Sequence, residues 1–267
     1  TNTGLTDLRL SSNKMAIEGS PWLGQILKYL PNLIKLDLAG NDIDETASSS
    51  LREACIGRFT NLTSLKLSQN PIGDKGMLEM ALGLAGLGAL RSLQIFNCEI
   101  TDAGAAAIGA ALASLPCLRK LEVAYNRISH DGFRLITEWL LVEGSRNRLT
   151  HINIDGNVCG DEVTESFQRL LLQGPFLQRL FLRGNFLTLQ GVCKMIELVQ
   201  EHENLVQVEL GGNLEKTDTA ANRELAYLAT LLEQRNFLLR DQGKQDGERK
   251  DFSLVDVVDV DAGGLPV

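Results

Sequence analysis

The chain is short of the residues on which several classes of protein depend. Aromatic residues make up only 5% of its 267 residues, and it has six prolines, three histidines and five cysteines. An odd number of cysteines without CxxC pairs or Cys/His clusters disfavours a disulfide framework or a zinc site, so we expect free thiols and a reducing, cytoplasmic compartment. No apolar run reaches the ~18 residues of a membrane span, and no charged-then-apolar signal segment opens the chain.

The chain is also short of positive charge. It carries 34 acidic and 26 basic residues, which gives a net charge of −8 and an isoelectric point near 5.0. Nucleic-acid binding needs clustered Lys and Arg to neutralise phosphates, so we expect no nucleic-acid partner. What the chain has in excess is leucine, with 47 residues, and such an excess of one residue type points to a repeat.

The repeat has the pattern L-x-x-L-x-L-x-x-N and occurs eight times. Its copies begin at Leu5, Leu33, Leu62, Leu90, Leu118, Leu149, Leu177 and Leu205. They end at Asn13, Asn41, Asn70, Cys98, Asn126, Asn157, Asn185 and Asn213. The end positions are 28, 29, 28, 28, 31, 28 and 28 residues apart. The one longer interval places its extra residues in the polar stretch 143–148.

Within each repeat the spacing of apolar residues predicts one strand followed by one helix. Apolar and polar residues alternate up to the final Asn, as in a strand that is buried on one side. The spacing then becomes helical, as at Ile108, Leu112 and Leu115. One strand and one helix cannot bury their own apolar faces, so the units must stack. We expect the recurring Asn to form a buried ladder that satisfies backbone groups, with Cys98 replacing it once.

Aspartate and glycine recur where each helical segment starts. Asp74, Asp102, Asp131 and Asp161 are expected to cap a helix or to lie in its first turn. Glycine follows the Asn-type position by six residues at Gly19, Gly76, Gly104, Gly132 and Gly191. The missing side chain would let the helix start approach its neighbour closely. Trp22 and Trp139 fall within helical segments and are predicted to be core residues.

These features resemble the leucine-rich-repeat family, specifically its ribonuclease-inhibitor-like subtype. The resemblance rests on the 28–29-residue unit, the change from Asn to Cys at the strand exit, and the stretch Ile100-Thr101-Asp102-Ala103-Gly104. It covers about residues 5–235. It implies an α/β fold, a curved solenoid or horseshoe with parallel β-strands on the concave side and α-helices on the convex side.

We divide the chain at residue 239. Residues 1–239 are predicted to form the repeat domain, with eight repeats and a closing helix from Thr217 to Leu239, and residues 240–267 an acidic C-terminal tail. No polar capping unit precedes the first repeat, so we expect a preceding part of the natural protein, or another molecule, to cover that flank. The tail mixes valines with Asp256, Asp259 and Asp261, and it either docks back on the solenoid or contacts a partner.

The residues that catalysis and metal binding require are scattered. His130, His151 and His202 fall in different repeats, and no phosphate loop, dinucleotide motif or HExxH motif is present. We therefore predict a protein that is not an enzyme and has no catalytic or metal-binding residues, no cofactor and no small-molecule substrate. GTPase-activating proteins of the Ran type share the repeat subtype, but none of their functional loop residues can be placed on this sequence by motif.

The strand residues that flank the buried apolar positions face the concave space, and repeats four to seven stand out there. The predicted partner-binding residues are Phe96, Lys120, Tyr125, His151, Arg179, Phe181, Arg183 and Phe186. Exposed aromatic residues beside Arg are enriched at binding hot spots. Alternatively, Tyr125 and Phe186 only cover the loops that leave the strands. The patch is basic on an acidic protein, which favours an acidic peptide, and the chain's own tail is one candidate.

The expected function is a non-catalytic protein–protein interaction module or a scaffold subunit of a larger intracellular assembly, with protein partners in a multi-subunit complex. The alternative is a regulator of an enzyme, either a Ran-type GTPase activator or an inhibitor that covers an active site. The fold does not decide between them, because function depends on the surface residues.

Overall fold

A computed structural model describes residues 4–13, 15, 20–55, 59–142, 148–174, 176–202 and 204–214. The predicted closing helix, Thr217 to Leu239, and the predicted tail, residues 240–267, lie outside the described residues. The described part contains all eight copies of the repeat, so the fold of the repeat array can be compared with the prediction.

Strands and helices alternate along the described chain, one of each per repeat. The strands are β1 (Asp7–Arg9), β2 (Lys35–Asp37), β3 (Ser64–Lys66), β4 (Ser92–Gln94), β5 (Lys120–Glu122), β6 (His151–Asn153), β7 (Arg179–Phe181) and β8 (Gln207–Glu209). The helices are α1 (Ser20–Leu27), α2 (Glu45–Cys55), α3 (Gly73–Leu84), α4 (Asp102–Leu112), α5 (His130–Leu140), α6 (Val163–Gln173) and α7 (Leu189–Glu201).

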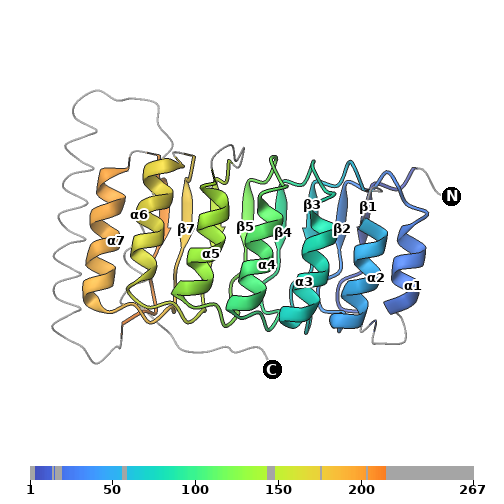
Figure 1. Ribbon diagram of the computed structural model, residues 1–267, viewed down its shortest axis with the longest axis horizontal. Helices are drawn as coiled ribbons and strands as arrows, with labels where there is room; N and C mark the ends of the chain where they lie inside the picture. The colour runs from blue at the N-terminus through green and yellow to red at the C-terminus, as the bar shows by residue number, and fades with distance from the viewer. Residues whose placement is uncertain are drawn as a thin grey trace.

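The strands form one parallel sheet whose order is the order of the sequence, from β1 to β8. Figure 1 shows the helices side by side in one layer and the strands in a second layer behind them. Each strand pairs with the next at equivalent repeat positions, for example Leu36 with Leu65 and Leu121 with Ile152. Strands need about 4.8 Å of width and helices about 10 Å, so the stack bends with its strands on the concave side. The predicted leucine-rich-repeat solenoid is confirmed.

The core lies between the two layers and runs the length of the array. The repeat leucines fill it, since Leu36, Leu65, Leu93 and Leu121 are each at most 1% exposed. Burying one such side chain contributes roughly 1.5–3 kcal/mol. Because each unit contacts mainly its neighbours, this stabilisation depends on the stacking of consecutive repeats.

The asparagine ladder is also confirmed. Asn126 Nδ2 donates to the carbonyl oxygens of Ile95 and Val123, each at 2.9 Å. Its Oδ1 accepts from the backbone N–H groups of Cys98 at 2.9 Å and Ile100 at 3.1 Å. The side chain therefore joins the fourth repeat to the fifth through backbone groups that no strand or helix would otherwise pair.

Cys98 replaces asparagine with a different set of bonds. Its thiol donates to the carbonyl oxygen of Leu67 at 3.3 Å, and burial raises its pKa to about 12. The preceding repeat adapts, because the Ile72 N–H bonds the carbonyl oxygen of Asn70 at 2.8 Å within a turn. Cys98 is thus a neutral packing residue. Cys117, Cys159 and Cys193 are also free thiols in the described part of the chain.

The aspartates at the helix starts bond to the next repeat. Asp74 lies in the first turn of α3, as expected, but its Oδ1 accepts from the N–H groups of Thr101 at 2.8 Å and Gly104 at 2.9 Å. A Cβ atom on Gly104 would lie 2.6 Å from that same oxygen. Asp102 makes the equivalent bond to Ser129 at 2.7 Å. The recurring Asp and Gly therefore form one inter-repeat contact.

Gly109 marks a close approach of α4 to α5. A Cβ atom there would lie 2.7 Å from Trp139 Cδ1 and 3.0 Å from the backbone oxygen of Leu135. Trp139 itself is 40% exposed, so its predicted place in the core is wrong. The Trp139 ring lies over Gly109, where a residue with a side chain would collide with it. The side chain of Trp22 lies outside the described residues.

Replacing Gly109 with alanine is therefore expected to lower the free energy of unfolding by about 1–3 kcal/mol, since the backbone of α5 has to move. Urea denaturation followed by circular dichroism measures this change. Gly88→Ala is the matched control, because a Cβ atom on Gly88 would meet nothing within 4 Å. A loss as large in the control as in Gly109→Ala would contradict the close-approach argument.

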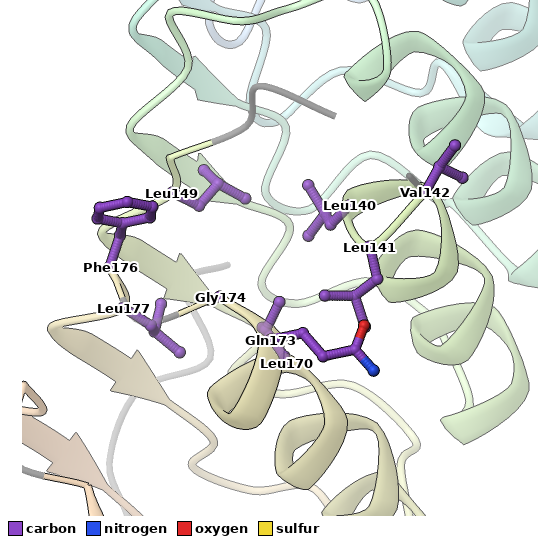
Figure 2. A pocket seen from close by; sticks show the side chains of 9 residues that line it. All are labelled: Leu140, Leu141, Val142, Leu149, Leu170, Gln173, Gly174, Phe176 and Leu177. Atoms are coloured by element: carbon purple, nitrogen blue, oxygen red, sulfur yellow. The ribbon is translucent and has the colours of Figure 1, made fainter. Parts of the chain in front are cut away.

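The long repeat leaves a hollow between the C-terminal ends of α5 and α6. Its extra residues were predicted at 143–148, and residues 143–147 lie outside the described part. The hollow has a volume of about 200 Å³, and Figure 2 shows leucine side chains around it from both helix ends and from the segments that lead into β6 and β7. Beside it the Arg148 guanidinium lies 5.4 Å from the ring centre of Phe176.

Candidate functional site

The concave wall consists of three rows of outward-facing side chains, one residue per repeat in each row. The first strand residues are Asp7, Lys35, Ser64, Ser92, Lys120, His151, Arg179 and Gln207. The last strand residues are Arg9, Asp37, Lys66, Gln94, Glu122, Asn153, Phe181 and Glu209. Two positions further on stand Ser11, Ala39, Ser68, Phe96, Ala124, Asp155, Arg183 and Gly211.

In the first three repeats four of the five charged side chains of this wall form ion pairs, and Lys35 has none among the described residues. Arg9 lies 3.0 Å from Asp7 on the same strand, and Lys66 lies 3.3 Å from Asp37 on the neighbouring strand. Such exposed pairs are worth little energy and leave few charges for a ligand. This end of the wall is a solvated surface.

From β5 to β7 the first strand residue is basic three times in succession. Lys120, His151 and Arg179 are paired in register across β5, β6 and β7. We call these three residues the basic row. Adjacent strands lie about 4.8 Å apart, so the row is about 10 Å long. The structure brings together these three predicted site residues.

The surroundings of His151 show how closely the row is packed. The pKa of His151 is lowered, chiefly by burial of the ring and then by the nearby charges of Arg179 and Lys120. The Thr150 hydroxyl lies 2.7 Å from His151 Nδ1. Glu122 forms an ion pair with Lys120 at 2.5 Å and opposes the lowering only weakly. At neutral pH, therefore, the row carries a neutral imidazole between two cations.

Phe181 and Arg183 lie at the end of β7, beside two acidic residues. The Arg183 guanidinium forms an ion pair with Glu209, and the Arg183 N–H donates to Asp155 Oδ1 at 2.6 Å. Phe181 is half-buried between Asn153 on β6 and Glu209 on β8. Arg183 was predicted as a contact residue, but here its charge is already paired within the wall.

Asp155 is a functional candidate that sequence reasoning did not select. It is only 8% exposed, and burial raises the pKa of its carboxyl to about 6 although the Arg183 N–H and guanidinium act in the opposite direction. A carboxylate that is costly to ionise is often found at functional sites. The equivalent residues Ser68 and Ala124 are also buried, at 1% and 3% exposed, so the position in the repeat is itself the signal for this burial.

Asp155→Asn is expected to stabilise the protein at pH 7.5 by about 1–3 kcal/mol. The folded pKa of about 6 exceeds the unfolded value, so the folded state binds more protons between pH 4 and 6. The free energy of unfolding of the natural chain therefore falls as pH rises through that range, and the asparagine variant avoids this loss. Urea denaturation at pH 7.5 and pH 4 measures the difference, which should vanish at the lower pH.

Asp37→Asn is the control for this substitution, because Asp37 pairs with Lys66 on the exposed wall. It should lose no more than about 1 kcal/mol at pH 7.5. An Asp155→Asn variant that is less stable than the natural chain at pH 7.5 would show that the carboxylate stabilises the fold.

Tyr125 and Phe186 lie on the loops that leave the strands, with strongly exposed rings and a left-handed backbone. Tyr125 is 61% exposed with φ of 53°, and Phe186 is 70% exposed with φ of 60°. A bulky residue in this region of φ is strained by roughly 1–2 kcal/mol. An exposed ring on a strained backbone adds little to the free energy of folding, so stability does not account for either aromatic residue.

The position of Tyr125 has a positive φ in every repeat. Its residues are Ser12, Gly40, Gln69, Asn97, Tyr125, Gly156, Gly184 and Gly212. The Tyr125 ring lies against the next of these residues, since a Cβ atom on Gly156 would meet it at 2.6 Å. The ring therefore lies next to Gly156, the first of three glycines at this position in repeats six to eight. These glycines recur every 28 residues in the sequence, which is the signal that could have predicted this feature.

Phe96 is not brought together with the other aromatic residues. It follows β4 and is half-buried, with its N–H bonded to the Ser68 hydroxyl at 3.2 Å. Phe181 belongs to β7, three strands away, or about 14 Å at the spacing of parallel strands. The eight predicted site residues thus extend over four repeats and form a wall rather than a pocket.

The described residues include no cluster suited to metal binding and no helix that could cross a membrane. No group of three His, Cys, Asp or Glu side chains among them lies close enough to hold a metal ion. None of their helices has the length and apolar character that crossing a bilayer requires. The three histidines lie in separate repeats, at the start of α5, on β6 and after α7.

The fold and the repeated wall define the class: a solenoid of leucine-rich repeats. A family model described as Leucine Rich repeat matches residues 29–46, 60–81 and 90–109. Two curated relatives are both Tonsoku-like proteins. The one from Danio rerio is 28% identical over 227 residues, which cover 80% of this chain and 16% of the relative. The one from Mus musculus is 32% identical over 99 residues, which cover 36% of this chain and 7% of the relative.

The chain therefore spans only a small part of the relatives that it matches. The similarity to the Danio rerio protein extends well beyond the segments matched by the repeat model. The comparisons support leucine-rich repeats as the building unit, and this class of repeat suggests protein–protein interaction.

Proposed function

We propose that the concave wall from β4 to β8 binds a partner protein, and that the chain acts as a non-catalytic scaffold subunit of an intracellular assembly. The observation that carries the proposal is the contrast between the two ends of the wall. The three rows of the first three repeats hold no aromatic residue, and four of their five charges form ion pairs. The later repeats present the basic row beside exposed aromatic residues.

The aromatic residues support a binding role because the fold gains little from them. Tyr125 and Phe186 expose most of their surface and keep a backbone conformation that glycine adopts more easily. Aromatic residues next to Arg are the usual anchors of protein interfaces. The wall of strands β4 to β8 is about 19 Å across at 4.8 Å per strand, wide enough for a peptide segment or a protein edge.

The relatives support a modular role. Only 16% of the Danio rerio Tonsoku-like protein aligns with this chain, so the matching repeats there are one part of a far longer polypeptide. An array of this kind within a long protein is suited to holding a partner in place. The 28–29-residue unit supports the ribonuclease-inhibitor-like subtype, and the free thiols support a reducing cytoplasmic location.

The test is a quantitative pull-down from native extract with the full chain and a Tyr125→Gly, Phe181→Ala, Phe186→Gly variant. Glycine suits the positive φ of Tyr125 and Phe186, so this variant is expected to keep its circular dichroism spectrum and melting temperature. We expect a stoichiometric partner of the natural chain to be lost from the variant.

The matched control removes three exposed apolar side chains from other surfaces. Tyr29, Leu78 and Leu82 are 62%, 58% and 57% exposed, so their replacement by alanine changes a similar apolar area. This control variant should retain the partner. Retention by the concave variant together with loss by the control would place binding outside the concave wall and contradict the proposal.

A further inference from the structure

The basic row is a local group of basic residues on an acidic protein. Lys120, His151 and Arg179 are direct neighbours across β5, β6 and β7. Glu122 pairs with Lys120 at 2.5 Å, whereas Arg179 has no ion pair among the residues that the structure describes. The rest of the chain is rich in acids, with a net charge of −8. The fold therefore concentrates positive charge at this one register of the wall.

The row does not stabilise the fold. The pKa of His151 is lowered chiefly by burial of the ring and further by the charges of Arg179 and Lys120, so a proton on the imidazole is disfavoured between the two cations. At the same register the first three repeats carry Asp7, Lys35 and Ser64, which do not repel one another. A bound anion would relieve the repulsion between β5 and β7.

Resting on the proposed function, we infer that the basic row binds an acidic segment of the partner protein, extended across β5, β6 and β7. The charge of the row is complementary to carboxylates. Lys120 and Arg179 are two strands apart, or about 10 Å. Carboxylates two or four residues apart lie on one face of an extended chain, about 7 or 13 Å from each other, and the long Lys and Arg side chains can reach either spacing. Phe181, on the same face of β7 as Arg179, offers an apolar contact to the residues between them.

The wall favours a peptide over a nucleic acid. Glu122 and Glu209 lie within the same wall, and both point toward the concave side beside a basic partner. A phosphate backbone carries a charge at every nucleotide and would meet these carboxylates. An acidic peptide can place carboxylates at Lys120 and Arg179 and neutral residues opposite Glu122 and Glu209.

The test measures fluorescence anisotropy of a labelled ten-residue peptide of Asp and Val, titrated with the full chain at low salt. A peptide of Asn and Val controls for the charge. In a Lys120→Gln, Arg179→Gln variant we expect the affinity for the acidic peptide to fall at least about fivefold. Removing the two charges should change the melting temperature little, because the repulsion between Lys120 and Arg179 is lost together with the half-exposed ion pair of Lys120 with Glu122.

Two further variants make the test specific. Lys35→Gln, Lys75→Gln removes the same number of charges elsewhere, with Lys35 at the same register on β2 and Lys75 on α3. It should change the affinity less than about twofold. Glu122→Gln releases Lys120 from its ion pair and should raise the affinity by about two- to threefold.

Acidification adds a second readout. Lowering the pH from 7.5 to 5.5 increases the protonated fraction of His151 between Lys120, Glu122 and Arg179 and should strengthen binding of the acidic peptide. His151→Gln should remove this increase. Asp155, whose carboxyl has a pKa of about 6, faces the same wall, so Asp155→Asn must retain the increase if the imidazole is its source.

Several results would overturn the inference. One is an equal loss in the Lys35→Gln, Lys75→Gln control. Another is tighter binding of a ten-nucleotide thymidine single strand that also depends on the row. A full chain with Asp256→Asn, Asp259→Asn and Asp261→Asn that binds the peptide more tightly would show that the chain's own tail occupies the row.

The pull-down separates this inference from the proposed function. If the Lys120→Gln, Arg179→Gln variant keeps the partner while the aromatic variant loses it, the wall binds a partner but not through an acidic segment. If both variants keep the partner, the proposed function fails together with the inference.

Discussion

Asn126→Ala is expected to lower the free energy of unfolding by about 3–5 kcal/mol, although it removes a single small side chain. Asn126 is 5% exposed and bonds backbone groups of its own repeat and of the preceding one. Alanine leaves the N–H groups of Cys98 and Ile100 without an acceptor in a buried site. Each such group costs about 1–3 kcal/mol.

Urea denaturation followed by circular dichroism measures this loss. Asn13→Ala is the matched control, because Asn13 has the same place in the first repeat but is exposed and can exchange its partners for water. It should cost less than about 1 kcal/mol. Equal losses at both positions would show that the ladder stabilises each loop locally and does not join repeats.

Phe167→Ala is the second substitution with a large expected effect, about 3–5 kcal/mol. Phe167 in α6 and Phe133 in α5 are both fully buried, with ring centres 4.6 Å apart. They join the fifth repeat to the sixth through the helix layer. Alanine would remove the aromatic contact and leave a cavity between the two helices.

Phe186→Ala is the matched control for Phe167→Ala, because it removes the same atoms from a ring that is 70% exposed. It should change stability by less than about 0.5 kcal/mol. Since neighbouring repeats stabilise one another, Phe167→Ala is also expected to broaden the transition or to split it at the fifth repeat. A single sharp transition with a loss below 1 kcal/mol would contradict this account.

The period of the sequence was sufficient to predict the fold. Leu121 pairs with Ile152 in the predicted register although their repeats are separated by the longer interval. A unit of one strand and one helix can bury its apolar residues only against the equivalent unit, so the spacing determines both the strand order and the concave rows. The same logic predicted the buried Asn ladder and the glycines at the helix starts.

Other features depend on contacts that spacing does not specify. The carboxylate of Asp74 bonds to Thr101 of the next repeat, and no local pattern distinguishes that bond from a cap on its own helix. Asp155 is buried beside Arg183, which itself pairs with Glu209. Trp139 contacts Gly109 of the neighbouring helix and leaves the rest of its ring partly exposed. The partner-binding role of the eight predicted residues remains a prediction.

The most direct test of the central claim is site-specific photo-crosslinking with a benzophenone amino acid. It replaces Phe181 on the concave wall in one full-length chain and Leu82 of α3 in another. The account predicts a stoichiometric crosslink to one partner from position 181, mapped by mass spectrometry to an acidic segment, and none from position 82. A crosslink from position 82 without one from position 181 would contradict it.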